Sequence, residues 1–143
     1  MTDEALSAFK ARMALTMTQE IQWGDMDAFR HVNNTIYFRY FENIRIRYFD
    51  HTGVNDLMKQ SQIGPILGST ECKFLAPLTY PDVITIGTSI TDRAEKRFTM
   101  SYEIFSHAQQ KVVAKGSGVV VYYDYNKNTS CAIPQTIADA IDG

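Results

Sequence analysis

A chain of 143 residues, of which 45% are hydrophobic, can bury one core without disulfides or a structural metal. Its 14 basic and 16 acidic residues leave a formal charge of -2, which excludes the basic surface typical of nucleic-acid binding. We therefore expect one domain over residues 1–143, with its core over about residues 13–125 and no nucleic-acid partner.

The first residues are acidic where a secretory signal would be basic, and no apolar run is long enough for a membrane span. A cytoplasmic protein with no membrane partner is therefore predicted. Cys72 and Cys131 match no CxxC or zinc spacing, so each is expected to be a free, small apolar residue. The first dozen residues are expected to fray.

In chain order, the first regular pattern covers residues 13–23, where apolar and polar residues alternate as in a half-buried strand. Residues 35–50 then place aromatic and aliphatic side chains at helical steps of three and four. Few polar residues interrupt them, so this helix is expected to be buried on most of its sides by a broad surrounding part of the fold. Glu42 in its middle is expected to pair with Arg39 or Arg45, since the alternative is a wet pocket.

After this helix, residues 51–65 carry Gly, Asn and Pro and predict a connection. The rest of the chain is rich in β-branched and aromatic residues and predicts four strands, followed by a short tail helix. The predicted order is an α+β fold, with one antiparallel-rich sheet curled around one buried helix. The strands cover residues 66–78, 83–91, 98–106 and 112–125, and the tail helix lies near residues 134–141.

The stretch WGDMDAFRHVNN, residues 23–34, concentrates polar side chains directly before the apolar helix. It can be a loop that only starts the helix, because Asp25 and Asp27 can satisfy backbone N–H groups and asparagines are good helix caps. It can also be an active site, because the start of a helix presents free N–H groups and a positive dipole end to an anion. The residues alone leave both interpretations open.

A family resemblance favours the active site. The Asp-x-Asp pair, the HVNN element, the aromatic helix containing a Glu, and FLAPLTYPD between two strands resemble the acyl-CoA thioesterases of the hotdog fold. The branch that includes 4-hydroxybenzoyl-CoA thioesterase is the most similar, and HVNN is also similar to plant acyl-ACP thioesterases. The resemblance implies a five-stranded antiparallel sheet wrapped around a long central helix. It further implies a homodimer or homotetramer with active sites between subunits, and no metal or organic cofactor.

The resemblance also assigns roles to residues. Asp27 corresponds to the catalytic carboxylate, acting as general base or nucleophile, and the N–H that polarises the thioester carbonyl falls near Asn34. His31 can orient Asp27, contact the substrate or only bond the loop. We expect Asn33, Tyr37 and Arg97 to bind substrate, Asn33 and Tyr37 from the helix start and Arg97 through CoA phosphates, although Arg93, Lys96 and Arg97 can equally form a solvated turn.

The expected function is hydrolysis of a fatty or aromatic acyl thioester carried by CoA or by acyl carrier protein. HExxH, P-loop, GxGxxG and GxSxG elements are absent from the sequence. Two alternatives stay open. One is a non-catalytic acyl-binding or partner-docking module, and the other is a hotdog dehydratase or hydratase, which the RHVNN stretch disfavours because it lacks a His-Phe-Pro-Gly type element.

Overall fold

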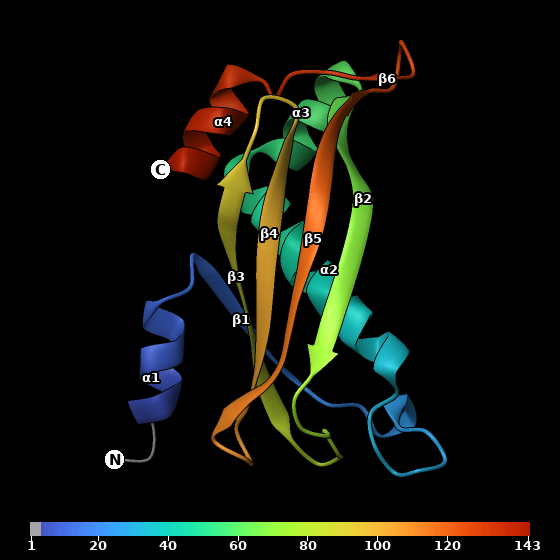
Figure 1. Ribbon diagram of the computed structural model, residues 1–143, viewed down its shortest axis with the longest axis vertical. Helices are drawn as coiled ribbons and strands as arrows, with labels where there is room; N and C mark the ends of the chain where they lie inside the picture. The colour runs from blue at the N-terminus through green and yellow to red at the C-terminus, as the bar shows by residue number, and fades with distance from the viewer. Residues whose placement is uncertain (1–3) are drawn as a thin grey trace.

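The computed structural model describes residues 4–143. The elements are α1 (Glu4–Ala11), β1 (Leu15–Glu20), the 3₁₀ helix η1 (Trp23–Asp25), α2 (Asn34–Thr52), α3 (Val54–Ser61), β2 (Ile63–Phe74), β3 (Val83–Arg93), β4 (Arg97–Ser106), β5 (Lys111–Asp124), the short β6 (Thr129–Ser130) beside β5, and α4 (Gln135–Asp142). Five antiparallel strands, in the order β1-β3-β4-β5-β2, curl around the 19-residue helix α2 (Figure 1). The hotdog arrangement expected from the sequence is thereby confirmed.

One face of helix α2 is buried because its aromatic and aliphatic side chains fill the concave face of the sheet. The buried residues recur at helical spacing, as the sequence predicts. The helix can approach the sheet closely because Gly116 of β5 has no side chain: a Cβ there would meet the Phe41 ring and lie 2.5 Å from the Glu71 carbonyl oxygen. The buried residues of α2 are Tyr37, Tyr40, Phe41, Ile44, Tyr48 and Phe49.

Two helices occur where the sequence predicts none. Within the first dozen residues, α1 is held by Phe9, which is buried against Phe105 with 5.4 Å between ring centroids; residues 1–3 lie outside the described residues. Within the predicted connection 51–65, α3 is anchored by the buried Val54. The core therefore extends beyond residues 13–125, and α4 also contributes buried apolar residues to it.

The charged residues of α2 differ from the expectation. Glu42 is exposed, and among the residues described it forms no ion pair with Arg39 or Arg45, so the expected pairing is wrong within one chain. Arg45 is half-buried and donates a hydrogen bond of 3.1 Å to the Tyr102 hydroxyl instead. Both cysteines are free, as predicted. Residues 4–143 contain no helix with the length and hydropathy needed to cross a membrane.

Candidate active site

The polar stretch between β1 and α2 folds into a tight turn. Met26 and Val32 pair as an isolated antiparallel bridge, and the Asp27 N–H donates to the His31 carbonyl oxygen at 2.9 Å. The Arg30 N–H donates a hydrogen bond of 3.0 Å to the Asp27 carbonyl oxygen. Arg30 has a φ of 66°, in the left-handed region that non-glycine residues rarely adopt. Asp27 and His31 are thereby held at the two ends of one turn.

Asp27 faces an aromatic hollow. Its Oδ1 accepts the Phe29 N–H at 2.9 Å, and none of the described residues bonds its second oxygen. The side chain is half-buried at the edge of a hollow of about 390 Å³. A carboxylate oxygen is thus left available beside aromatic surface that is itself accessible, since Trp23 is 70% exposed. The hollow is lined by Trp23, Gly24, Met26, Asp27, Arg30, Thr79 and Tyr80.

The start of α2 presents an unused backbone donor. Asn33 is the N-cap, and its Oδ1 accepts both the N–H and the hydroxyl of Thr35 at 2.9 Å. Asn34, the first helical residue, is exposed, and its N–H has no acceptor within residues 4–143. A free N–H at the positive end of a 19-residue helix can stabilise negative charge on a bound oxygen.

The capping role of Asn33 predicts how substitutions there change the free energy of unfolding. Replacing Asn33 by Ala removes the acceptor for Thr35 and is expected to lower the free energy of unfolding by about 1 kcal/mol. Asn33→Asp keeps an acceptor oxygen in the same place and is expected to stay within about 0.5 kcal/mol of the unmodified protein. Urea unfolding followed by circular dichroism measures both. Equal losses in the two variants would contradict a capping role.

His31, Asn34 and Tyr37 line a second hollow, a groove of about 290 Å³. Its opposite wall is the end of β2 and the segment after it, and the Tyr37 ring meets Phe74 edge-to-face with centroids 4.9 Å apart. Burial raises the pKa of Tyr37, although a hydrogen bond from the backbone of Leu78 opposes this shift. Sequence reasoning missed this wall as part of the site; the signal was the FLAPLTYPD segment. The wall consists of Phe74, Leu75, Ala76 and Pro77.

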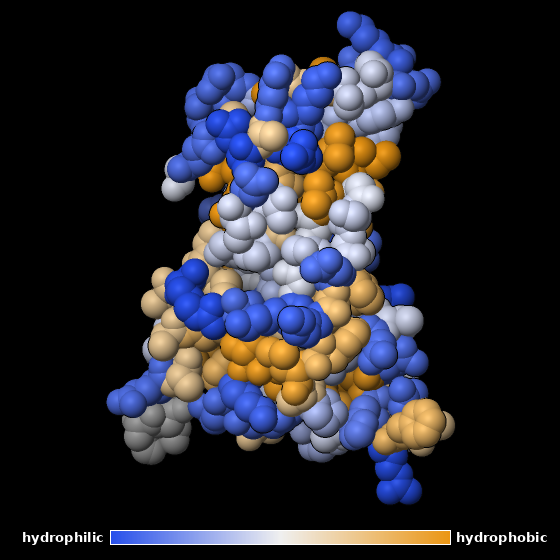
Figure 2. Space-filling model, in the orientation of Figure 1, coloured by the Kyte–Doolittle hydropathy of each residue, from blue (hydrophilic) through white to orange (hydrophobic). Residues whose placement is uncertain are grey.

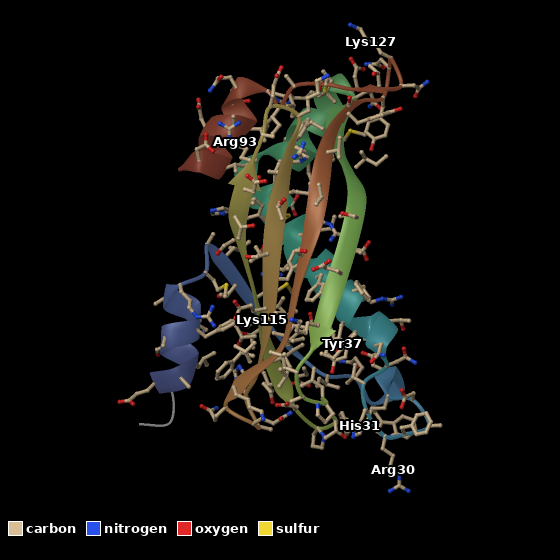
Figure 3. All side chains as sticks on the ribbon, in the orientation of Figure 1. Arg30, His31, Tyr37, Arg93, Lys115 and Lys127 are labelled. Atoms are coloured by element: carbon tan, nitrogen blue, oxygen red, sulfur yellow. The ribbon has the colours of Figure 1, made fainter. Side chains whose placement is uncertain are left out.

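The structure does not bring all the expected residues into one cleft. The Asp27 hollow and the His31 groove share no lining residue, although both border the same turn. Asp25 holds the helix start through its backbone carbonyl oxygen, which accepts the Asn33 N–H at 3.0 Å. Arg97 lies beyond the turn that follows Arg93, at the opposite end of the sheet from His31 and Tyr37 (Figure 3). Within one chain, Arg97 therefore stands apart from the helix start.

Cys72 lies near the groove and carries a thiol, which is a potential nucleophile. Its thiol is close enough to the Tyr37 hydroxyl to contribute to the raised pKa of that group. Burial raises the pKa of Cys72 to about 11, so at neutral pH the residue is a neutral thiol and a poor nucleophile. We therefore expect that Cys72 does not act as a nucleophile and that Cys72→Ala keeps the catalytic rate constant of the unmodified chain within about twofold. A loss of catalysis with unchanged thermal stability would contradict this.

Comparison with known proteins agrees with the fold. The chain is 27% identical over 114 residues to acyl-acyl carrier protein thioesterase ATL3 of Arabidopsis thaliana, which covers 79% of this chain and 60% of ATL3. It therefore spans less than two thirds of that relative. The solved gentisyl-coenzyme A thioesterase BH1999 superposes with a TM-score of 0.78 at 24% identity, covering 89% of this chain and 99% of BH1999.

A thioesterase superfamily protein from Jannaschia sp. CCS1 superposes with a TM-score of 0.85 at 22% identity, covering 99% of this chain and 90% of that protein. At such identities these superpositions establish a shared fold. The sequence itself matches the thioesterase-like superfamily over residues 21–141, which is most of its length. The chain belongs to the thioesterase-like superfamily.

Proposed function

We propose that this protein is an acyl-CoA thioesterase, which hydrolyses a thioester to a carboxylic acid and a free thiol. The observation that carries the proposal is the exposed, unused N–H of Asn34 at the tip of α2, a few residues from a carboxylate with a free oxygen at Asp27. Membership of the thioesterase-like superfamily supports the same reaction. Gentisyl-CoA and acyl-ACP thioesterases are among the proteins it is similar to.

The proposed chemistry uses the two groups in turn. The Asn34 N–H and the helix dipole stabilise the oxyanion that forms when the thioester carbonyl is attacked. Asp27 either removes a proton from the attacking water or attacks the carbonyl itself, forming a mixed anhydride that water then hydrolyses. His31, at the other end of the turn, positions the Asp27 loop, while Asn33 keeps the helix start formed. The thiol leaves as thiolate and takes a proton from solvent.

We propose that the acyl group lies against aromatic surface. Tyr37 and Phe74 line the groove at the helix tip, while Trp23 and Tyr80 line the hollow beside Asp27. Both surfaces suit a fatty or an aromatic acyl group, because an aromatic wall packs against either. Neither hollow alone contains both Asp27 and Asn34.

A second copy of the chain is proposed to complete the site, in a homodimer or a homotetramer. Strand β2 lies at one edge of the sheet, with Ile66, Leu67 and Phe74 each at least 40% exposed. Figure 2 shows hydrophobic surface along the upper part of this edge. An open, apolar edge strand is a ready template for pairing with another strand. Antiparallel pairing would invert the second copy and bring its Arg97 end toward the Asp27 end of the first, where Arg97 could meet a CoA phosphate.

The test is hydrolysis of a panel of acyl-CoAs with fatty and aromatic acyl groups, following the released thiol by its reaction with a chromogenic disulfide. Thiol release from at least one substrate, with saturation, is the expected result. Acyl-CoA binding without thiol release, measured by calorimetry, would instead favour a non-catalytic acyl-binding module. Loss of the acyl α,β-unsaturation without thiol release would indicate a hydratase.

A further inference from the structure

The flank of α2 that faces the edge strand β2 carries two opposite charges. Asn43 donates a hydrogen bond of 3.2 Å to Gln19 of β1, which fixes the side of the helix that faces the β1 edge. Each helical residue advances about 100°, so Arg45 lies about 160° from Asn43, toward β2. Phe38 and Glu42 lie within about 60° of Arg45 on the same flank. Glu42 is exposed and Arg45 half-buried, and neither is ion-paired within the described chain.

These charges lie level with the second half of β2. Phe41, next to Glu42, lies over Gly116, which pairs with Cys72 of β2. The Tyr102 hydroxyl that binds Arg45 lies 3.0 Å from the Cβ position of Gly118, which pairs with Thr70. Glu42 and Arg45 are therefore at the height of Thr70–Cys72, inside the strand and not at either end of it.

The occupant that fits this surface is a second copy of the chain. A two-fold axis pairs a surface with itself, so a residue that meets a different residue does so twice. If the axis passes β2 near Thr70–Cys72, the two α2 helices run antiparallel at that height, and each Glu42 faces an Arg45. Parallel helices would instead place like charges together. The apolar edge of β2 adds hydrophobic area to the same face.

We propose that Glu42 of each chain pairs with Arg45 of the partner subunit, and that these reciprocal ion pairs set the register of a β2-to-β2 dimer. This inference rests on the second copy invoked for the proposed function. In that register, Phe74 of one chain lies beside the Leu67–Gly68 segment of the partner subunit. Because Phe74 lines the groove at the helix tip, the partner would supply part of the groove wall.

Charge reversal tests the pairing. Glu42→Arg and Arg45→Glu are each expected to raise the dimer dissociation constant by about tenfold or more, because each places two like charges opposite one another. The double variant Glu42→Arg/Arg45→Glu restores opposite charges and is expected to return to within about threefold of the unmodified chain. Sedimentation equilibrium across a range of protein concentrations measures all three constants.

A matched control is Arg39→Glu, which reverses an exposed charge about 120° around α2 from Arg45 and is expected to change the constant by less than about threefold. Thermal melts verify that every variant is folded, and Glu42→Arg leaves the Arg45–Tyr102 hydrogen bond in place. The proposal would be overturned if the double variant dimerised as weakly as the single variants, or if neither single variant changed the dissociation constant. It would also be overturned if the unmodified protein were a monomer. If the double variant regains dimerisation but the protein hydrolyses no thioester, the proposed function is contradicted and the proposed interface is supported.

Discussion

Replacing Asp27 by Asn is expected to lower kcat for acyl-CoA hydrolysis by about 100- to 10,000-fold. An amide neither accepts the proton of an attacking water nor forms an anhydride with the acyl group. The substitution leaves the turn intact, because the Asn Oδ1 can still accept the Phe29 N–H that Asp27 accepts at 2.9 Å. Thiol-release kinetics should therefore show a collapse of kcat, while KM and the thermal midpoint change little.

Asp25→Asn is the matched control, since it makes the same chemical change two residues earlier. Asp25 holds the start of α2 through its backbone carbonyl oxygen, which the substitution keeps. The control is expected to retain kcat within about threefold. If Asp27→Asn retains comparable activity, Asp27 is neither base nor nucleophile. If Asp25→Asn is the damaging change, the carboxylate has been assigned to the wrong residue.

The central helix and the strands could be predicted from sequence because their patterns are local and strong. Helix α2 covers Asn34–Thr52 where residues 35–50 were predicted, and β4 begins within one residue of the predicted start. Such periodicity reports directly which face is buried. The ends were less certain: the predicted strand at residues 13–23 ends at Glu20, and Trp23 is exposed in η1 instead of continuing the buried face.

The missed helices depend on information that the local pattern does not carry. Gly53 adopts a φ of 86° and ends α2, but it also begins α3, so a residue typical of a turn sits between two helices. Helix α1 is stabilised by tertiary packing, since Phe9 reaches Phe105 nearly a hundred residues later in the chain. Eight-residue helices of this kind are too short to be stable by propensity alone.

The sequence proposes residues for the candidate site, but it does not indicate whether they lie in one cleft. The HVNN element does start α2, with Asn33 as its cap. Whether Asp27 faces the tip of that helix depends on how the segment after β2 packs, because this segment supplies the walls of both hollows. It also depends on what covers the open edge of β2, and pairing between chains leaves no local signature in one sequence.

Gly116→Ala is expected to lower the free energy of unfolding by about 3 kcal/mol, the largest stability loss predicted for this chain. The new methyl group would overlap the Phe41 ring and lie 2.5 Å from the backbone oxygen of Glu71 on the neighbouring strand. A ring could turn aside, but a strand carbonyl cannot move without breaking the β5–β2 ladder. For a domain of this size the thermal midpoint should fall by about 10 °C.

Gly24→Ala is the control for Gly116→Ala, because nothing lies within 4 Å of a Cβ at Gly24. Its unfolding free energy is expected to stay within about 0.5 kcal/mol of the unmodified protein. Gly118→Ala should fall between the two, since its Cβ would lie 3.0 Å from the Tyr102 hydroxyl, which is a side-chain atom and not backbone. This order tests whether α2 lies so close to the sheet that β5 tolerates no side chain at residue 116. Gly116→Ala as stable as Gly24→Ala would mean that the helix, and with it the Asn34 N–H, can shift away from the sheet.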